Sequence, residues 1–381
     1  MNKRTFSIIC ILVAALLSTG CKQEDQGTPE AQQPVSIKLG HVGHDHHSAL
    51  YVALDNAADY LPRTGIDVKT VEDRKLYQLW RGNKKVADVE VVKVGGGSEM
   101  PTALAQGVID VGLGGVAPVL ASIDNGAPIR LIAPLHHKGD MFVVRPDFPA
   151  QTWAEFVTVA KAADKPLRIG YKDPVACAKV IFEEALRHEG LAFAGDPSQT
   201  GIKVHMVNVQ GGGKLNVALS GELVDGYVGN NPFPAIAVEK GMGRVLCDLE
   251  DLPPGTFRNH PCCCIAARAD VVTQKSAAVT DLLALFLEAT GTINSDFDKV
   301  VTATVRWIGT SETVERMSIP TSGYAMDPSE QWHEAMAQWA SVMDGLGVFR
   351  DKLKGKSPQE VAEIAYDFSL LVKAKQKVGD R

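Results

Sequence analysis

Residues 88–118 read DVEVVKVGGGSEMPTALAQGVIDVGLGGVAP, and the same pattern returns at residues 202–232 as IKVHMVNVQGGGKLNVALSGELVDGYVGNNP. Each copy holds an alternating apolar run, three glycines, a short segment with Ala-Leu, an aspartate, a second apolar run and a proline. Alternation of apolar and polar residues favours a β-strand, and a run of glycines lets the chain turn sharply into a helix. The pattern predicts two strand–helix–strand units, one in each of two α/β lobes.

The two glycine turns are predicted ligand contacts. A helix N-terminus presents free N–H groups and a positive dipole end, and ligands of open α/β sheets lie beyond the carboxyl ends of the strands. A single glycine turn is typical of an ordinary tight turn, but duplication at matched positions favours a binding role. The expected contacts are Gly96, Gly97, Ser98 and Pro118 in the first copy, and Gln210, Gly211 and Gly212 in the second.

Other polar residues near these turns have two interpretations each. Asn230 and Asn231 end the second copy, where short amides serve either a turn or a ligand. Asp173 follows a predicted strand at residues 167–170 and is either a helix N-cap or a ligand contact. Glu99 follows the first glycine turn; facing a cleft it would repel an anion, and facing outward it would only complement the helix dipole.

The N-terminal segment has the form of an export signal. Lys3 and Arg4 precede an apolar run at residues 6–17, and residues 17–21 read Leu-Ser-Thr-Gly-Cys. The run is too short for a membrane span, so residues 1–20 are a predicted signal peptide. Its ending resembles the bacterial lipobox, which implies that Cys21 is lipidated; an ordinary signal peptide or an anchor helix is the alternative. Residues 21–34 lack large apolar side chains and are predicted to be a disordered tether.

The rest of the chain bounds the class of protein. It has about 345 residues, too many for one compact core and suited to two lobes. The net charge is −6 and the basic residues are scattered, so we expect no nucleic-acid partner. The sequence holds no P-loop, nucleophile elbow or HExxH motif, so we expect a binding protein without a cofactor rather than an enzyme. We also expect this protein to be a monomer.

Residues 41–47, HVGHDHH, concentrate four imidazoles just after a predicted strand at residues 36–41. A neutral imidazole is a common metal ligand and an imidazolium is a good anion donor. Three interpretations therefore compete: an anion or polar organic site, a metal site, and a solvated loop. The predicted ligand contacts are His41, His44, His46, His47 and also His136, which follows a strand ending at Leu135.

The run Pro261-Cys262-Cys263-Cys264 is unusual in a chain with few cysteines. In an oxidising compartment, these thiols together with Cys177 and Cys247 are first expected to form disulfides. Cys262 is also a predicted ligand contact. The alternative metal site would combine His44, His46, His47, Cys262 and Cys263.

The chain resembles the nitrate/sulfonate/taurine-type substrate-binding proteins of ABC transporters, a group that includes thiamine-pyrimidine binders. The resemblance spans nearly all of the mature chain. It is carried by residues 37–57 (IKLGHVGHDHHSALYVALDNA), 103–133 (ALAQGVIDVGLGGVAPVLASIDNGAPIRLIA), 141–148 (MFVVRPDF), 167–191 (LRIGYKDPVACAKVIFEEALRHEGL), 218–246 (ALSGELVDGYVGNNPFPAIAVEKGMGRVL) and 262–272 (CCCIAARADVV).

This resemblance implies the type II periplasmic-binding-protein fold, with two α/β lobes joined by two crossing strands. Lobe 1 would span residues 35–138 and lobe 2 residues 139–260, and residues 261–381 would add a return strand and helices that brace both. The protein would capture a small polar organic solute of the sulfonate, taurine or nitrate class between the lobes. It would deliver that solute to an ABC permease and ATPase from the periplasmic side of the cell envelope, anchored to a membrane by its lipid.

Several alternative functions remain open. The solute could be a thiamine-pyrimidine precursor, a metal or a metal complex, or the chain could be a metal-dependent enzyme using the histidine loop and Cys262–Cys264. A sensory or docking lipoprotein is a further alternative. The cysteine run also resembles the Cys-rich motif of fungal thiamine-pyrimidine synthases, in which the cysteines are associated with iron. That match is partial, because Ile265-Ala266 replaces the aromatic residue and Cys that follow in those enzymes, and their Lys and His are absent after residues 111–115.

Overall fold

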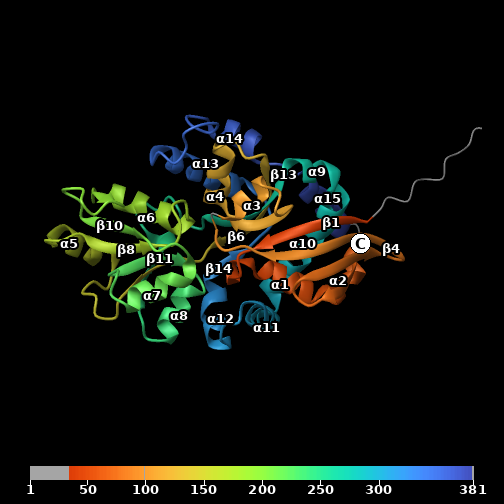
Figure 1. The fold of residues 1–381 in the computed structure, drawn as a ribbon, viewed down its shortest axis with the longest axis horizontal. Coiled ribbons are helices and arrows are strands. Elements are labelled where there is room, and N and C mark those ends of the chain that lie inside the picture. Colours follow the sequence, from red (N-terminus) through yellow and green to blue (C-terminus); the bar gives the residue numbers. More distant parts are fainter. Residues whose placement is uncertain (1–33, 98, 380–381) are drawn as a thin grey trace, which may run out of the picture. The chain divides into compact units, whose positions relative to one another are not determined.

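The computed structural model describes residues 34–97 and 99–379. The predicted signal peptide, Cys21, residues 21–33 of the tether and the predicted contact Ser98 lie outside the described residues. The compact unit that contains the elements below runs Pro34–Arg381. Figure 1 shows these elements as a ribbon whose colours follow the sequence.

The first sheet, within the described part of the chain, has eight strands in the order β14-β6-β13-β5-β1-β4-β3-β2. These strands are β1 (Val35–His41), β2 (Asp67–Glu72), β3 (Leu76–Arg81), β4 (Lys84–Lys93), β5 (Val111–Gly115), β6 (Ile129–Lys138), β13 (Pro261–Arg268) and β14 (Ser322–Tyr324). Because β1 pairs in parallel with both β4 and β5, the loops that follow these three strands start at the same edge of the sheet. That edge carries the histidine loop and the first glycine turn.

The second sheet repeats the arrangement on a smaller scale. Its order in the described residues is β12-β7-β11-β8-β10-β9. Its strands are β7 (Asp140–Val144), β8 (Leu167–Tyr171), β9 (Phe193–Ala194), β10 (Val204–Asn208), β11 (Gly226–Asn230) and β12 (Arg244–Asp248). β8 pairs in parallel with β10 and β11, so each predicted strand–helix–strand unit places its two strands on either side of one central strand.

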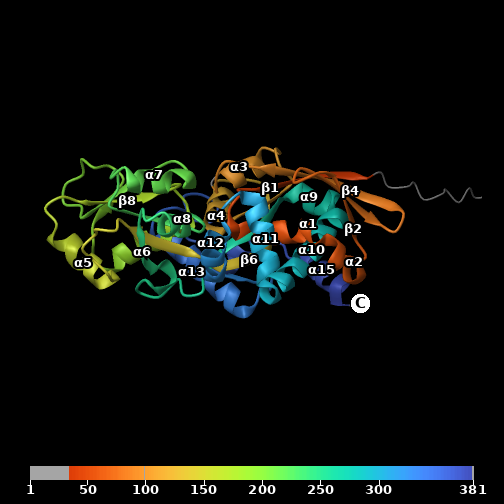
Figure 2. The same ribbon diagram turned by 90° about the horizontal axis from the view of Figure 1, so that it is seen from below.

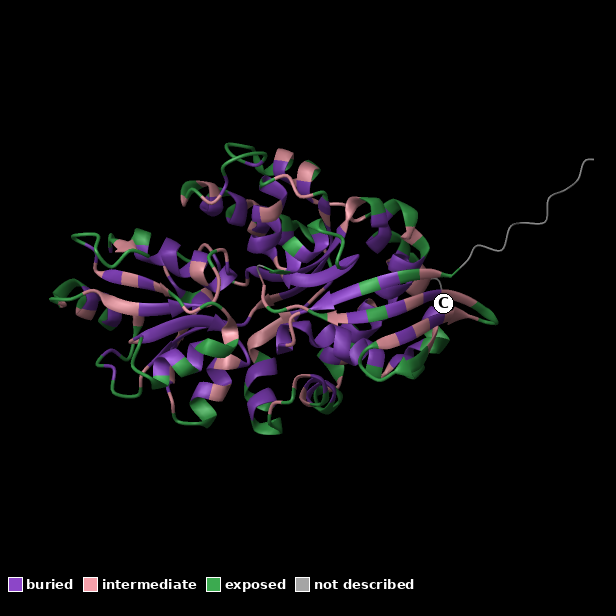
Figure 3. Cartoon of the chain, in the orientation of Figure 1, coloured by how far each residue is buried: buried purple, intermediate pink, exposed green. Residues whose placement is uncertain are grey.

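Helices cover both sheets, and the buried residues concentrate in the strands and on the helix faces that pack against them (Figure 3). Figure 2 shows α1, α10 and α11 beside one another, and all three are in contact. The helices of the first half are α1 (Ser48–Asp55), α2 (Ala57–Thr64), α3 (Glu99–Ala105), α4 (Val116–Asp124), α5 (Trp153–Ala162) and α6 (Cys177–His188). Those that follow are α7 (Leu215–Ser220), α8 (Phe233–Glu239), α9 (Ala269–Gln274), α10 (Ser276–Ser295), α11 (Phe297–Ile308), α12 (Glu312–Ser318), α13 (Glu330–Gly345), α14 (Pro358–Ala365) and α15 (Ser369–Gly379).

Two of these helices have informative sequences. α10 is long and apolar enough to cross a membrane, but most of its residues are buried inside the protein, as expected of a core helix. α14 begins with a capping box, in which Ser357 and Glu360 exchange hydrogen bonds around Pro358.

The chain crosses between the two sheets twice, and the two crossing segments lie side by side. β6 passes through Gly139 into β7, while the return segment enters β13 through His260. The Lys138 N–H donates to the His260 carbonyl at 2.9 Å, and Pro261 pairs with His137. Gly139 has a φ of +86°, and a Cβ there would lie 2.6 Å from Nε2 of His46, so this crossing requires glycine.

Candidate functional site

The predicted histidine loop folds inward against the crossing strands. It forms the short 3-10 helix η1 (Asp45–His47) between β1 and α1. His44, His46 and His47 are all buried, and His47 has no exposed surface. The solvated-loop interpretation is therefore wrong, because the loop packs beneath other elements rather than facing water.

His46 and His136 lie side by side, with ring centroids 4.1 Å apart. Nε2 of His46 is 3.3 Å from the Gly139 carbonyl, and its Nδ1 is 3.6 Å from Sγ of Cys262. Nδ1 of His136 is 3.2 Å from the His137 carbonyl, and its buried Nε2 has no hydrogen-bond partner among the described residues. In each ring one N–H donates to a backbone carbonyl, which leaves the lone pair of the other nitrogen available, as in metal-ligating histidines.

Cys262 and Cys263 complete a four-residue group with these histidines. One ligand atom from each of His46, His136, Cys262 and Cys263 lies within 4.8 Å of the others. Successive side chains of a regular strand point to opposite faces, but the pairing of β13 with β6 shifts register on both sides of Cys263. This irregularity explains how two adjacent thiols belong to one group.

Asp140 and His260 extend the group along the crossing strands. The Cys262 thiol donates to Oδ2 of Asp140 at 3.2 Å, and Nε2 of His260 is 3.5 Å from that oxygen. Nδ1 of His260 is 2.7 Å from the Phe257 carbonyl. Neither residue was predicted from the sequence, although each is next to a crossing: Asp140 follows Gly139, and His260 precedes Pro261. The positions of the crossings were the signal that could have found them.

The second sheet contributes polar groups of another kind. Lys172 follows β8 and hydrogen-bonds to Asn230 at the end of β11. Asp173 has a buried carboxylate oxygen with no hydrogen-bond partner in the described part of the chain, and it faces Gly96 and Gly97 across the site. The N-cap interpretation of Asp173 is wrong, because α6 begins after Ala176 and has no side-chain cap.

A small cavity of about 20 Å³ lies between these two sets of residues. That volume is about the size of one water molecule. The lining residues are Val42, His44, His46, Gly97, Gly114, Gly115, Pro118, Asp140, Lys172, Asp173, Ala176, Cys177, Asn230, Cys262 and Cys263.

The electrostatics of the cavity favour neutral imidazoles. Burial lowers the pKa of His136 to about 3, and burial together with the charges of His136 and Lys172 lowers the pKa of His46 well below its ordinary value. Both rings are therefore neutral near pH 7, which is the form that ligates metals and not the form that attracts anions. Burial also raises the pKa of the Cys263 thiol.

Three predicted contacts serve the packing around the site rather than its cavity. His41 hydrogen-bonds to the Tyr51 hydroxyl at 3.1 Å, and His47 accepts the Val42 N–H through Nδ1. Asn231 donates to Thr321 at 2.8 Å and accepts the backbone N–H at the start of α8.

The two glycine turns differ in position. Gly97 lines the cavity, and Gly96 lies beside Asp173, whereas the Gly95 N–H donates to the carboxylate of Glu99 at 3.0 Å. Gln210, Gly211 and Gly212 are absent from the cavity lining. The second turn is held elsewhere: the Gly211 N–H donates to the Lys172 carbonyl, and the ring of Phe233 covers the place of a Cβ at Gly212.

The expected disulfides are a wrong prediction. Cys177, Cys247, Cys262, Cys263 and Cys264 are all free thiols. Cys264 is in the apolar core, and Cys247 is on β12 of the second sheet. Neither belongs to the cysteines that line the cavity, which are Cys177, Cys262 and Cys263. Cys177 donates instead to the Cys262 carbonyl at 3.4 Å.

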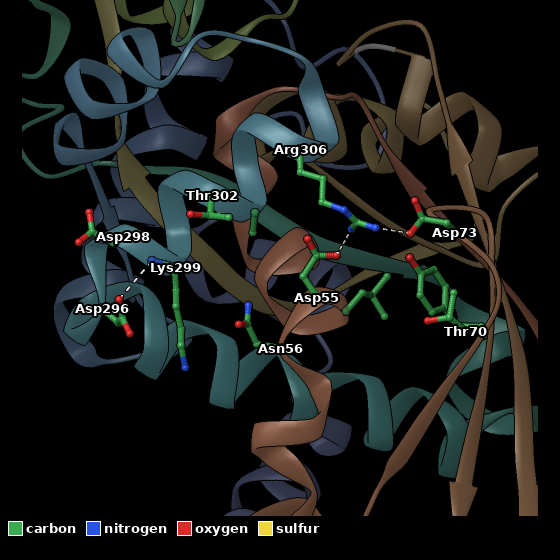
Figure 4. A pocket seen from close by; sticks show the side chains of 12 residues that line it. Asp55, Asn56, Thr70, Asp73, Asp296, Asp298, Lys299, Thr302 and Arg306 are labelled. Atoms are coloured by element: carbon green, nitrogen blue, oxygen red, sulfur yellow. Dashed lines mark hydrogen bonds and ion pairs between the residues drawn. The ribbon is translucent and has the colours of Figure 1, made fainter.

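A larger surface pocket of about 520 Å³ lies elsewhere, between α1, α11 and the β2–β3 hairpin (Figure 4). Figure 4 shows Arg306 reaching between Asp55 and Asp73, with which it forms ion pairs. Asp298 pairs with Arg316, and Asp296 caps α11. These charges are already compensated, so volume alone does not make this pocket the functional site.

Solved structures share this fold. The zinc-bound ligand-binding component of an ABC-type import system from Staphylococcus aureus has a TM-score of 0.69 and 17% identity, covering 90% of this chain and 99% of that one. The nitrate-binding protein of Synechocystis PCC 6803 has a TM-score of 0.67 and 15% identity, with 90% and 89% covered. The alkanesulfonate-binding protein of Xanthomonas axonopodis pv. citri, bound to MOPS, has a TM-score of 0.63 and 16% identity, with 87% and 98% covered.

The architecture is thus the expected periplasmic-binding-protein fold. An uncharacterized protein of Methanocaldococcus jannaschii is 36% identical over 136 residues, which are 35% of this chain and 90% of that protein. The family model described as the NMT1-like family matches residues 30–306. The chain belongs to the NMT1-like family.

Proposed function

We propose that this protein is the solute-binding component of an ABC-type importer and that its solute is a transition-metal ion or a small complex of one. The carrying observation is the convergence of His46, His136, Cys262 and Cys263, whose ligand atoms lie within 4.8 Å of one another. Imidazole and thiolate together favour zinc, copper(I), iron or nickel over magnesium or calcium. The fold shared with import components, one of them zinc-bound, supports the transport role.

The crossing strands give this site a natural means of capture and release. His46 and the cysteines belong to the first sheet and its loops, whereas Lys172, Asp173 and Asn230 belong to loops and strands of the second. A hinge motion at Gly139 and His260 would bring these groups together or separate them. We propose that the protein does this on the periplasmic side of a membrane, tethered through Cys21, and passes the solute to a permease and its ATPase.

The sulfonate, taurine and nitrate class is the competing proposal. Its support is the shared fold with proteins that bind sulfonate or nitrate. Against it are the neutral imidazoles, the Asp140 and Asp173 carboxylates in the cavity wall, and a volume of about 20 Å³. A buried carboxylate repels a nearby anion strongly at low dielectric. A thiamine-pyrimidine ring or an enzyme substrate would also need far more space than this arrangement offers.

The experiment is metal titration of the full chain, purified from the cell envelope and stripped with a chelator. Zinc added in large excess over its Kd should raise the melting temperature by several degrees, because it binds only the folded state. Replacement Cys263→Ala should abolish that rise. Cys264→Ala is the matched control, since Cys264 is an adjacent buried thiol outside the group, and this variant should keep the rise.

The competing solutes are tested in the same assay. A panel of alkanesulfonates, taurine, nitrate and a thiamine pyrimidine should leave the melting temperature unchanged. A rise with one of these compounds and none with zinc, copper(I), iron(II) or nickel(II) would replace the metal proposal by the organic or anion one. Native mass spectrometry of the protein before stripping identifies what it carries from the cell.

A further inference from the structure

We infer that the site holds two metal ions bridged by the sulfur of Cys262, an inference that rests on the metal-binding function proposed above. The first ion has His46, His136, Cys262 and Cys263 as ligands. The second has Asp140, His260 and Cys262. Each set brings one ligand atom per residue within 4.8 Å of the others, and Cys262 is the member that both sets share.

Cys262 lies between the two sets. Its Sγ is 3.6 Å from Nδ1 of His46 on one side and 3.2 Å from Oδ2 of Asp140 on the other. Ligand atoms around one tetrahedral zinc ion are separated by roughly 3.3–3.8 Å, given the usual zinc–nitrogen and zinc–sulfur bond lengths. The 3.6 Å separation falls inside this range and the 3.2 Å separation lies just below it, so the same thiolate is placed to contact an ion on each side.

His260 is oriented like the two histidines of the first set. Its Nδ1 is 2.7 Å from the Phe257 carbonyl, and its buried Nε2 has no hydrogen-bond partner among the described residues. The rings of Phe257 and Trp339 pack around the imidazole at centroid distances of 6.0 Å. A backbone carbonyl therefore holds the ring while the lone pair of Nε2 faces Asp140 and Cys262.

Charge balance supports a second ion. Asp140 is 3% exposed, and no lysine or arginine of the described residues forms an ion pair with it. A first ion on Cys262 would displace the thiol proton that Asp140 accepts, and a second ion beside Asp140 would replace that lost partner of a buried carboxylate. When the ions bind, Cys262 and Cys263 each release a proton to solvent as their metal–sulfur bonds form.

The test is the number of ions bound per chain, measured by native mass spectrometry with zinc and by optical titration with cobalt(II). The wild-type chain should bind two zinc ions, and its thiolate-to-cobalt absorbance should saturate at two equivalents. His260→Ala should bind one ion, and Cys262→Ala should lose the second ion and weaken the first at least 100-fold. Cys264→Ala and His137→Ala, which alter residues outside both sets, should keep two.

The outcomes separate the two proposals. One zinc ion in both the wild type and His260→Ala would overturn the bridged pair and leave the proposed metal-binding function intact. No bound zinc or cobalt in the folded wild type would overturn both. Circular dichroism and the melting temperature of each stripped variant establish that a lost ion does not reflect a lost fold, and His260→Gln offers a second substitution if alanine prevents folding.

Discussion

The half of the site that comes from the first sheet and the crossing strands is built from imidazoles and thiols. The half that comes from the second sheet presents Lys172, Asp173 and Asn230. Soft ligands on one side and charged or amide groups on the other indicate a division of roles. Under the metal-binding proposal, the first half would bind the ion and the second half would cover it.

Thiol substitution should give the largest difference between the two halves. Cys262→Ala should weaken zinc binding at least 100-fold, because it removes a direct ligand. Asp173→Asn should weaken zinc binding by less than about tenfold, because Asp173 would contact the ion's surroundings and not the ion itself. Competition titration with a chromophoric chelator measures both. Comparable losses in the two variants would show that the second half also ligates the ion.

A buried carboxyl in the histidine loop predicts a pH-dependent stability. Burial, and then the charge of Glu315, raises the pKa of Asp45 to about 8. A carboxyl whose pKa is raised by folding contributes its stability fully below its unfolded pKa, near 4, and loses it as the pH rises through about 8.

Asp45→Asn should therefore be more stable than the wild type by an amount that grows between pH 4 and pH 8, at about 1.4 kcal/mol for each unit of pKa difference. Urea unfolding across this range measures it. A stability difference that is constant with pH would contradict the raised pKa. Asp164→Asn, an exposed residue between α5 and β8, is the control.

Replacement of the glycine at the crossing should destabilise the protein, because a side chain there would crowd His46 in the first half of the site. Gly139→Ala places a left-handed residue against Ser322 and His46, and we expect a loss of roughly 2–4 kcal/mol from strain and crowding together. Gly190→Ala, also left-handed but with open space around it, should lose only about 1 kcal/mol. Equal losses would mean that crowding by His46 contributes nothing.

The second glycine turn should affect stability alone. Gly212→Ala crowds the ring of Phe233 and should cost roughly 1–3 kcal/mol, whereas Gly213→Ala meets open space and should be close to neutral. Neither should change zinc affinity, because neither residue lines the cavity. If Gly212→Ala is fully folded and still binds zinc more weakly, the second glycine turn takes part in binding.

Particular residues show how far prediction from sequence reached. The duplicated pattern correctly predicted one strand–helix–strand unit in each sheet, because alternation and glycine turns are local properties. His44, His46, Gly97, Asn230 and Cys262 were expected near the cleft, and they line one cavity. Asp140, His260 and Lys172 were missed, because single polar residues at strand ends carry no motif.

The α/β class, the two repeated units and the presence of many soft ligands could be predicted from the sequence, since they depend on residue type and short-range spacing. Which of those ligands meet depends on tertiary packing. The bulged pairing of β13 placed two adjacent thiols in one group, and the crossing strands brought His46 into contact with Gly139 and Cys262. Contacts between residues more than 90 positions apart depend on packing, and no local pattern encodes them.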